Sequence, residues 1–495
     1  MSLPEPTLSL KHLSRRCLSA LLPLALLVPL PASQAQPLAL AAATQSLPVE
    51  VSAPLQRAGV PLSDVALLVA PADGGAPLVS HRVTQPMNPA SVMKLVTTGI
   101  ALDQLGPGFR WETRLWTDGS QRQQLLQGNL YVQGSGDPGL VQERLWLLLR
   151  ALRERGVQRI SGDLVLDNSV FQLPARDPGA FDGEPLQPYN AQPDGLLVNY
   201  KAFALQFQPD AGQGIAHVRL EPPMADSGLP ASLPLTEGSC NGWIAQLEAR
   251  SQAQRQIVLP ASYPSSCGDQ QWLAAWPQPQ EQAGKAILGM WQSLGGQLDG
   301  RVRYGSTPAT LLRGTPLASS QSEPLPQAVR HINKFSNNVM AQQLFLTLGV
   351  QRYGQGHFAA AQGAVRDWWQ RKLGPYTAPT PVNGSGLSRE GRISAASLGG
   401  LLQYMWRSPM MPDFVASLPI YGMDGTLRKQ ATGVAGRAHL KTGTLRDANA
   451  LAGYVTGLDG RRYVLVAMAN GPQAGRARDA FYQLVEWTAM QPGVR

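Results

Sequence analysis

The sequence predicts an α+β protein in which one domain, built from both ends of the chain, is interrupted by a large β-rich insert. Strand patterns occur near both ends and helical patterns precede the C-terminal ones, whereas short β-like runs separated by Gly, Pro and Asp fill the middle. A chain of 495 residues is too long for one core, so we expect a discontinuous domain, 36–110 and 310–495, with one or two inserted domains in 111–309.

Composition and charge describe a folded, loop-rich protein. The chain is 43% hydrophobic and 15% charged, with 50 Gly and 41 Pro. The net charge of +9 is scattered, and no run of five or more Lys or Arg occurs. We therefore expect no nucleic-acid partner, and only a loose attraction to anionic surfaces such as a membrane or cell wall.

The N-terminus has the pattern of a secretory signal peptide. Lys11, Arg15 and Arg16 precede the apolar stretch CLSALLPLALLVPL, which is followed by PASQAQP. This stretch is short for a membrane span and contains two prolines, which makes an uncleaved anchor the less favoured alternative. We expect residues 1–35 to be removed by cleavage after Ala35, and the mature protein to be periplasmic.

Cysteine usage agrees with export. Cys17 lies in the expected signal peptide, which leaves Cys240 and Cys267 in the mature chain. Two cysteines in an oxidising compartment predict one disulfide, and two buried free thiols are the alternative. The disulfide would close a loop of about 28 residues and contribute about 3–4 kcal/mol in the chain-entropy model.

The discontinuous domain begins with two strands and a helix. DVALLVAPADGGAPLVSHR predicts two strands around the turn Asp73–Gly75. A helix is expected over 89–105, with Asn88 as the cap, Pro89 at its first position and Gly106 at its stop.

The insert and the C-terminal part have different sequence patterns. In the insert, antiparallel β-runs dominate and QERLWLLLRALRERG is the main helix that we expect. Helices return in PLPQAVRHINKFSNNVMAQQLFLTLG, FAAAQGAVRDWWQRKLG and ISAASLGGLLQYMWRSP. RAHLKTGTL predicts a strand, ALAGYVTGLDGRRYVLVAMANGP predicts two strands around Leu458–Gly460, and ARDAFYQLVEWTAM predicts a final helix. The two ends of the chain should therefore share one sheet.

The stretch SVMK is a candidate nucleophile with its base. Ser91 and Lys94 are three apart, so they share one face of a helix, and Ser91 lies in the first turn, where free N–H groups favour negative charge. Lysine can accept a serine proton only if burial or a nearby cation lowers its pKa. Alone, this pattern is weak, and a helix-start serine beside a solvated lysine is the alternative.

Two further motifs follow in the order typical of penicillin-recognising serine enzymes. They are the SNN stretch at Ser336–Asn338, at the start of a helix, and the KTGT stretch at Lys441–Thr444, on a strand. A second SxN at Ser239–Asn241 is rejected because it lies in the insert and contains a cysteine expected to be paired. Taken singly, Ser336 and Asn338 could cap a helix, and Lys441 could be a surface lysine before a turn glycine.

Each motif has a chemical task in acyl transfer. Lys441 supplies a positive charge that lowers the pKa of Lys94 and can dock a carboxylate, and Gly443 lets a substrate backbone lie close. Ser336 can relay a proton to a leaving amine, and Asn338 can hold the lysine and a substrate amide. The backbone N–H groups of Ser91 and Thr444 are expected to form an oxyanion hole.

With these motifs the chain resembles the exported serine D-alanyl-D-alanine carboxypeptidases/endopeptidases of the class C, penicillin-binding protein 4 type. The resemblance extends to GNLYVQGSGDPGL, ISGDLVLDNSVF, YNAQPDGLLVNY, VNGSGLSREGRISA, YGMDGTL and the context of Cys240 and Cys267, and covers most of residues 60–475. The departure is Asn337, where the family often has Asp.

This resemblance implies a transpeptidase domain like that of serine β-lactamases, interrupted by an insert that accounts for the 245 positions from Ser91 to Ser336. It implies Ser91 as nucleophile and Lys94 as general base, acting on the D-Ala-D-Ala end or the D-Ala to diaminopimelate cross-link of peptidoglycan stem peptides. β-Lactams are the implied covalent inhibitors. The remaining implied residues are catalytic Ser336, Asn338 and Lys441 and substrate-binding Thr442, Gly443 and Thr444.

Other interpretations are kept beside this one. A β-lactamase of related fold, or a catalytically silent wall-binding scaffold, would share the motifs. Asp167 is a candidate for recognising diaminopimelate, with a structural strand-end role as the favoured alternative. The six histidines show no HxxxH or HxH spacing and no dinucleotide or Walker motif occurs, so no metal or cofactor is expected. The shape of the pocket in the insert decides between carboxypeptidase and endopeptidase.

Overall fold

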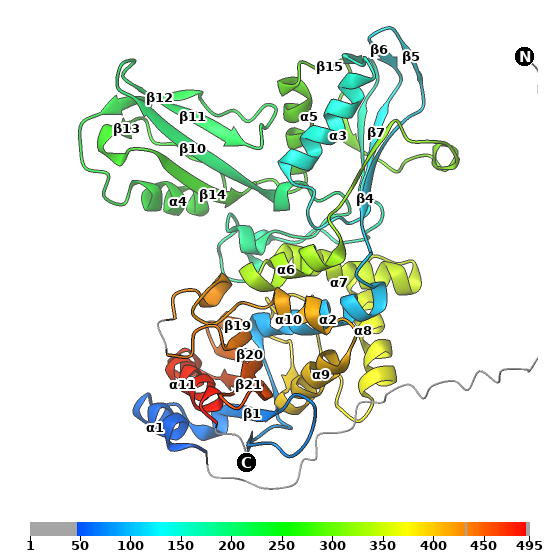
Figure 1. The fold of residues 1–495 in the computed structure, drawn as a ribbon. Coiled ribbons are helices and arrows are strands. Elements are labelled where there is room, and N and C mark those ends of the chain that lie inside the picture. Colours follow the sequence, from blue (N-terminus) through cyan, green and yellow to red (C-terminus); the bar gives the residue numbers. More distant parts are fainter. Residues whose placement is uncertain (1–46, 431–432, 492–495) are drawn as a thin grey trace, which may run out of the picture. The chain divides into compact units, whose positions relative to one another are not determined.

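The two ends of the chain contribute to a single antiparallel sheet, as the sequence predicts (Figure 1). This computed structural model describes residues 47–430 and 433–491, so the expected signal peptide lies outside the described residues. In the part that is described, no helix combines the length and the apolar character needed to cross a membrane. The sheet has the order β19-β20-β21-β1-β2, with β1 (Val65–Pro71), β2 (Val79–His81), β19 (Ala438–Leu445), β20 (Ala448–Thr456) and β21 (Arg462–Asn470).

Helices cover both faces of this sheet. Because strand side chains alternate, Ala66 and Leu68 of β1 pack into one core and Leu67 and Val69 into another on the opposite face. The second core includes α1 (Val49–Arg57) and α11 (Arg478–Ala489), the predicted final helix. The first core contains α2 (Lys94–Leu105), α6 (Leu325–Phe335), α7 (Asn338–Tyr353), α8 (Phe358–Leu373), α9 (Ala395–Arg407), α10 (Met411–Ser417) and the short pair β3 (Pro86–Met87) and β18 (Ile393–Ser394).

The insert is β-rich, but its sheets are mixed and not purely antiparallel as expected. Strands β7 and β9, for example, pair in parallel. One sheet has the order β16-β9-β7-β4-β17, with β4 (Glu112–Thr117), β7 (Leu130–Gln133), β9 (Leu164–Asp167), β16 (Val302–Tyr304) and β17 (Ala318–Gln321). A smaller one contains β5 (Ser120–Arg122), β6 (Leu125–Gln127), β8 (Arg159–Ile160) and β15 (Gln297–Leu298), and a third contains β10 (Ala202–Asp210), β11 (Ile215–Glu221), β12 (Ser232–Thr236), β13 (Tyr263–Pro264) and β14 (Gln270–Ala275).

Helices in the insert are more extensive than the sequence predicted. Besides the expected α3 (Gln142–Glu154), the structure contains α4 (Trp243–Gln254) and α5 (Gln282–Ser293). Two glycines weaken the helical signal of α5, but close packing requires one of them, because a Cβ at Gly289 would lie 2.5 Å from the Pro223 carbonyl oxygen. Tertiary packing therefore overrides local propensity in this helix.

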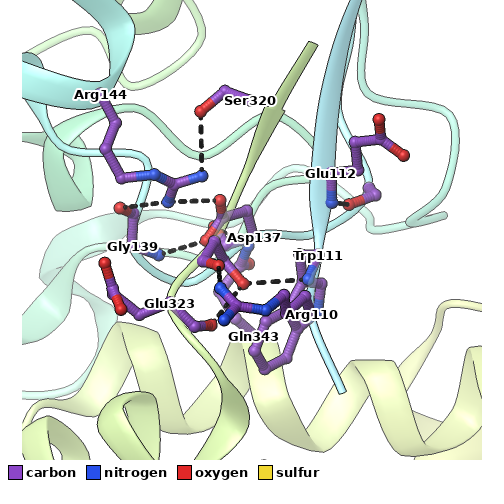
Figure 2. A network of polar contacts seen from close by, with 11 residues as sticks. Arg110, Trp111, Glu112, Asp137, Gly139, Arg144, Ser320, Glu323 and Gln343 are labelled. Carbon is purple, nitrogen blue, oxygen red and sulfur yellow. Dashed lines mark hydrogen bonds and ion pairs between the residues drawn. The ribbon is translucent and has the colours of Figure 1, made fainter. Parts of the chain in front are cut away.

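The chain enters and leaves the insert through neighbouring strands. Strand β17 pairs antiparallel with β4, with Gln321 opposite Glu112. Figure 2 shows the junction, where the Arg144 guanidinium contacts the Asp137 carboxylate at 2.7 Å and Ser320 Oγ of β17 at 3.3 Å. We therefore propose that the insert runs from about residue 112 to 321, past the expected end at 309; the polar sequence ASSQ of β17 has no strand alternation to reveal it.

The predicted disulfide between Cys240 and Cys267 is present. The two sulfur atoms are 2.03 Å apart and the two Cα atoms 4.8 Å apart. The bond ties the start of α4 to the segment between β13 and β14, at the side of the third sheet.

Candidate active site

Ser91 and Lys94 lie together, as the three-residue spacing predicted. The expected helix over 89–105 begins one turn late, because residues 90–93 form a 3₁₀ turn before α2. The N-cap position of this turn is Pro89 and not Asn88 as predicted, although Asn88 Oδ1 accepts from the Ala90 N–H at 2.9 Å. The Lys94 Nζ is 3.0 Å from Ser91 Oγ, so the serine and the lysine can exchange a proton directly.

The surroundings of Lys94 favour a neutral amine. Its side chain is 0% exposed, and no carboxylate among the described residues pairs with it. Burial, and next the positive charge of Lys441, hold the pKa of Lys94 well below its usual range. Nζ also contacts two atoms that can only accept, Asn338 Oδ1 at 2.6 Å and the Ser385 carbonyl at 2.7 Å. A neutral amine has two N–H groups for these acceptors, which leaves its lone pair for the hydroxyl proton of Ser91.

The second motif lies at the break between α6 and α7. Ser336 adopts a left-handed backbone conformation with φ 59°, and Asn337 caps α7 by accepting from the Met340 N–H at 3.1 Å. The capping role considered for Ser336 and Asn338 therefore belongs to Asn337 between them. Asp and Asn cap helices about equally well, so the departure from the family pattern at this position keeps its structural role.

Asn338 joins the catalytic domain to the insert. Its Oδ1 accepts from Lys94 Nζ, and its Nδ2 donates to the Tyr189 carbonyl at 3.0 Å. One amide group thus orients the lysine while the insert orients the amide. The contact uses a backbone carbonyl, which leaves no trace in the residue types of a sequence.

The third motif supplies a second buried lysine. Lys441 on β19 is 0% exposed, and its Nζ donates to Ser336 Oγ at 2.9 Å and to the Thr442 carbonyl at 2.8 Å. Lys441 is thus not a surface residue. Burial lowers its pKa to about 7, so the site binds fewer protons at neutral pH than two ordinary lysines would.

Gly443 is required by close packing inside the protein. A Cβ at this position would lie 2.5 Å from the Pro89 carbonyl oxygen and 3.0 Å from the Ser91 nitrogen. The glycine therefore lets β19 approach the turn that carries the serine, in addition to the predicted room for a substrate backbone. β19 is an edge strand of its sheet, and Leu440 donates to the Pro419 carbonyl at 2.9 Å just before the KTGT residues.

The hydroxyl of Thr442 has a partner that the sequence analysis did not identify. Thr426 Oγ1 lies 2.9 Å from Thr442 Oγ1, and Thr426 is exposed. Thr426 belongs to YGMDGTL, a stretch quoted for the family resemblance, so this signal was present in the sequence. Nearby, Asp424 of the same stretch pairs with the buried Lys334 of α6 at 2.5 Å.

Asp167 is not brought to the three motifs by any contact in the described structure. Its carboxylate, at the end of β9, accepts from Ser169 Oγ at 2.6 Å and from the Thr307 N–H at 2.7 Å. Its side chain is 3% exposed. All these partners belong to the insert, which favours the structural strand-end role over the predicted contact with diaminopimelate.

Fold and site together define a class of protein: a serine acyl-transfer enzyme with a buried lysine beside its serine, on an antiparallel sheet between helical layers. The chain belongs to the D-Ala-D-Ala carboxypeptidase 3 (S13) family, whose model matches residues 48–491. The resemblance inferred from the motifs is thereby confirmed, and the chain is a serine-type DD-peptidase.

Individual relatives agree with this family. The chain is 26% identical over 406 residues to the D-alanyl-D-alanine carboxypeptidase DacB of Haemophilus influenzae, covering 78% of this chain and 81% of that protein. It is 28% identical over 427 residues to a D-alanyl-D-alanine carboxypeptidase of Actinomadura, covering 81% and 77%. The crystal structure of penicillin binding protein 4 from H. influenzae has the same fold, with a TM-score of 0.69 and 23% identity over 88% of this chain and 99% of that one. That protein has also been solved in complex with a novel β-lactam.

Proposed function

We propose that this DD-peptidase acts through an acyl-enzyme on Ser91, with Lys94 as the general base. The observation that carries the proposal is the contact set of Lys94: two acceptor-only partners and the serine hydroxyl around one buried, unpaired amine. As Ser91 Oγ attacks a carbonyl carbon, Lys94 takes its proton. The N–H groups of Ser91 and Thr444 would then stabilise the oxyanion.

The remaining motif residues complete the reaction. Lys94 contacts Ser91 and Lys441 contacts Ser336, and Ser336 would relay a proton to the leaving amine. Thr442, with Thr426 beside it, would donate a hydrogen bond to the substrate carboxylate, and Gly443 keeps this strand close to Ser91. Water then cleaves the ester and restores the serine.

The proposed substrates are peptidoglycan stem peptides. Cleavage of the D-Ala-D-Ala end would be carboxypeptidase activity, and cleavage of the D-Ala to diaminopimelate cross-link would be endopeptidase activity. β-Lactams, which resemble the D-Ala-D-Ala end, should acylate Ser91. The expected signal peptide supports a periplasmic location, where this substrate is found, and the excess of basic residues supports loose attachment to anionic wall or membrane.

Intact-mass spectrometry after brief exposure to benzylpenicillin tests the proposal. The wild-type chain should gain one penicillin mass, Ser91→Ala should gain none, and Ser239→Ala, from the rejected SxN copy, should behave as wild type. The same spectrum should show a mature chain that starts at Gln36. A folded wild-type protein without an adduct would favour the silent scaffold, and rapid turnover of the drug would favour a β-lactamase.

A further inference from the structure

A concave surface lies beside the second motif, between the α6–α7 break and the insert. Its volume is about 480 Å³. We call it the junction groove and define it by the residues that matter below: Glu143, Tyr189, Glu221, Leu273, Phe335 and Ser336. Two of these residues come from the catalytic domain and four from the insert.

The wall of the junction groove is unusually apolar for a solvent-facing surface. Phe335 is 65% exposed, Leu273 61% and Tyr189 41%. Their positions are fixed by the fold: Phe335 ends α6, and Leu273 points outward from β14 between the buried residues Trp272 and Ala274. Large apolar side chains gathered on one exposed surface mark a binding site for a ligand or partner.

The charge of the junction groove restricts its ligand. The two charged side chains that line it are the carboxylates of Glu143 and Glu221, and no Lys or Arg of the described chain is among its lining residues. Glu221 is held in place by Gln206, whose Nε2 donates to Oε2 at 2.7 Å. The groove therefore favours a ligand segment made of methylenes and amides, or one that carries an amine.

The junction groove is continuous with the leaving side of the reaction centre. Ser336 lines the groove, and its Oγ accepts from Lys441 Nζ at 2.9 Å. Asn338 also lines it, while its amide bridges Lys94 and the Tyr189 carbonyl. The residue proposed to hand a proton to the leaving amine thus lies where the groove begins.

We propose that the junction groove binds the amine-side strand of a cross-linked stem peptide; this inference rests on the proposed function. A single D-alanine offers only a methyl group to the apolar wall, whereas the amine-side strand of a cross-link brings the methylenes and amides of the diamino acid together with its carboxylates. The bond between the D-Ala carbonyl carbon and the side-chain nitrogen of the diamino acid breaks as the ester to Ser91 forms. The serine proton goes to that nitrogen, and the amine-side strand leaves along Leu273 and Phe335.

A charge placed on the apolar wall tests the inference. Leu273→Glu is compared with Leu147→Glu, a leucine of α3 in the same insert that is 57% exposed and lies outside the junction groove. kcat/KM is measured on a purified cross-linked muropeptide dimer and on a monomeric pentapeptide, together with the rate of benzylpenicillin acylation. Leu273→Glu should lower dimer cleavage about tenfold and leave the other two rates within about twofold. Leu147→Glu should change none of them, and Leu273→Ala should give a smaller, dimer-specific loss.

The outcomes separate this inference from the proposed function. If the wild-type protein neither hydrolysed the pentapeptide nor became acylated by benzylpenicillin, the proposed function itself would be refuted. Wild-type protein that cleaves the pentapeptide but not the dimer would overturn the groove assignment alone. Equal effects of Leu273→Glu on both substrates, or no effect on either, would also overturn it.

Discussion

The catalytic motifs and the insert bury lysines in opposite ways. Lys94 and Lys441 are 0% exposed, and no carboxylate of the described residues pairs with either. In the insert, Lys201 is 7% exposed and its Nζ lies 2.8 Å from Asp194 Oδ2. An ammonium buried without a counter-ion loses its proton more easily, whereas a buried ion pair keeps both charges. The difference separates a lysine that can act as a base from one that holds a structure together.

The paired lysine belongs to the contact between the two parts of the molecule. The Asp194 side chain forms an ion pair with Lys201. The Asp194 backbone N–H donates to Gln343 Oε1 of α7 at 2.9 Å, and its carbonyl accepts from Gln343 Nε2 at 2.8 Å. Gln343 is 0% exposed and follows Asn338 on the same helix by less than two turns. The insert is thus anchored close to the amide that orients Lys94.

Removal of the unpaired base should have the largest effect. Lys94→Met should lower the acylation rate by benzylpenicillin about 10³- to 10⁴-fold, because Ser91 loses its proton acceptor. Urea unfolding should show a stability within about 2 kcal/mol of the wild type, because the cost of a buried amine without a counter-ion is removed while Asn338 Oδ1 and the Ser385 carbonyl lose their donor. Acylation within tenfold of wild type would show that another group is the base.

Removal of the paired lysine should do the reverse. Lys201→Met leaves the Asp194 carboxylate buried without its cation, so the free energy of unfolding in urea should fall by about 3 kcal/mol. The folded fraction should still be acylated by benzylpenicillin at nearly the wild-type rate. Lys285→Met is the control, since Lys285 and Glu281 form a looser 3.7 Å pair at the surface and the change should cost less than about 1 kcal/mol. If fully folded Lys201→Met protein were acylated much more slowly than the wild type, the distinction between the unpaired catalytic lysines and the paired Lys201 would fail.

The sequence predicted the site's members better than its supports. SVMK, SNN and KTGT name side chains of fixed chemistry, and in the structure Lys94 contacts Ser91 and Asn338 while Lys441 contacts Ser336. The groups that hold these side chains in position are backbone groups. The carbonyls of Ser385 and Tyr189 act through the backbone, which any residue possesses, so their role depends on where the chain folds.

The fold shows the same division. The strands at the chain ends were predicted, because a sheet covered on both faces has long apolar runs such as those of β1, β20 and β21. In the insert, α5 and β17 were missed, since glycines chosen for close packing weaken a helical signal and a short polar strand has none. For Asp167 the sequence left two roles open and favoured the structural one, because a strand-end carboxylate looks the same whether it binds substrate or its own loop.

Thr426 offers a smaller, more specific test within the catalytic domain. Thr426→Val keeps the shape but removes the hydroxyl 2.9 Å from that of Thr442. KM for a peptide with a free C-terminal carboxylate should rise about tenfold, whereas kcat and the hydrolysis of a C-terminal amide analogue should change little. Thr426→Ser restores a hydroxyl and should restore the wild-type KM. If hydrolysis of the carboxylate peptide and of the amide analogue fell equally, Thr426 would hold the strand in position and would not help to bind the substrate carboxylate.

The unpaired lysines also predict how stability depends on pH. The folded pKa of Lys441 is lowered to about 7, below its value in the unfolded chain, so above pH 7 the unfolded state binds more protons than the folded state. Stability should therefore rise with pH between about 7 and 10, by at most about 1.4 kcal/mol per unit for each such lysine. Lys94 and Lys441 each contribute one such proton difference between the unfolded and folded states, and Lys441→Met removes one of them. Between pH 7.5 and 9, the free energy of unfolding in urea should therefore rise less steeply with pH than in the wild type. A slope in Lys441→Met equal to that of the wild type would contradict the lowered pKa of folded Lys441.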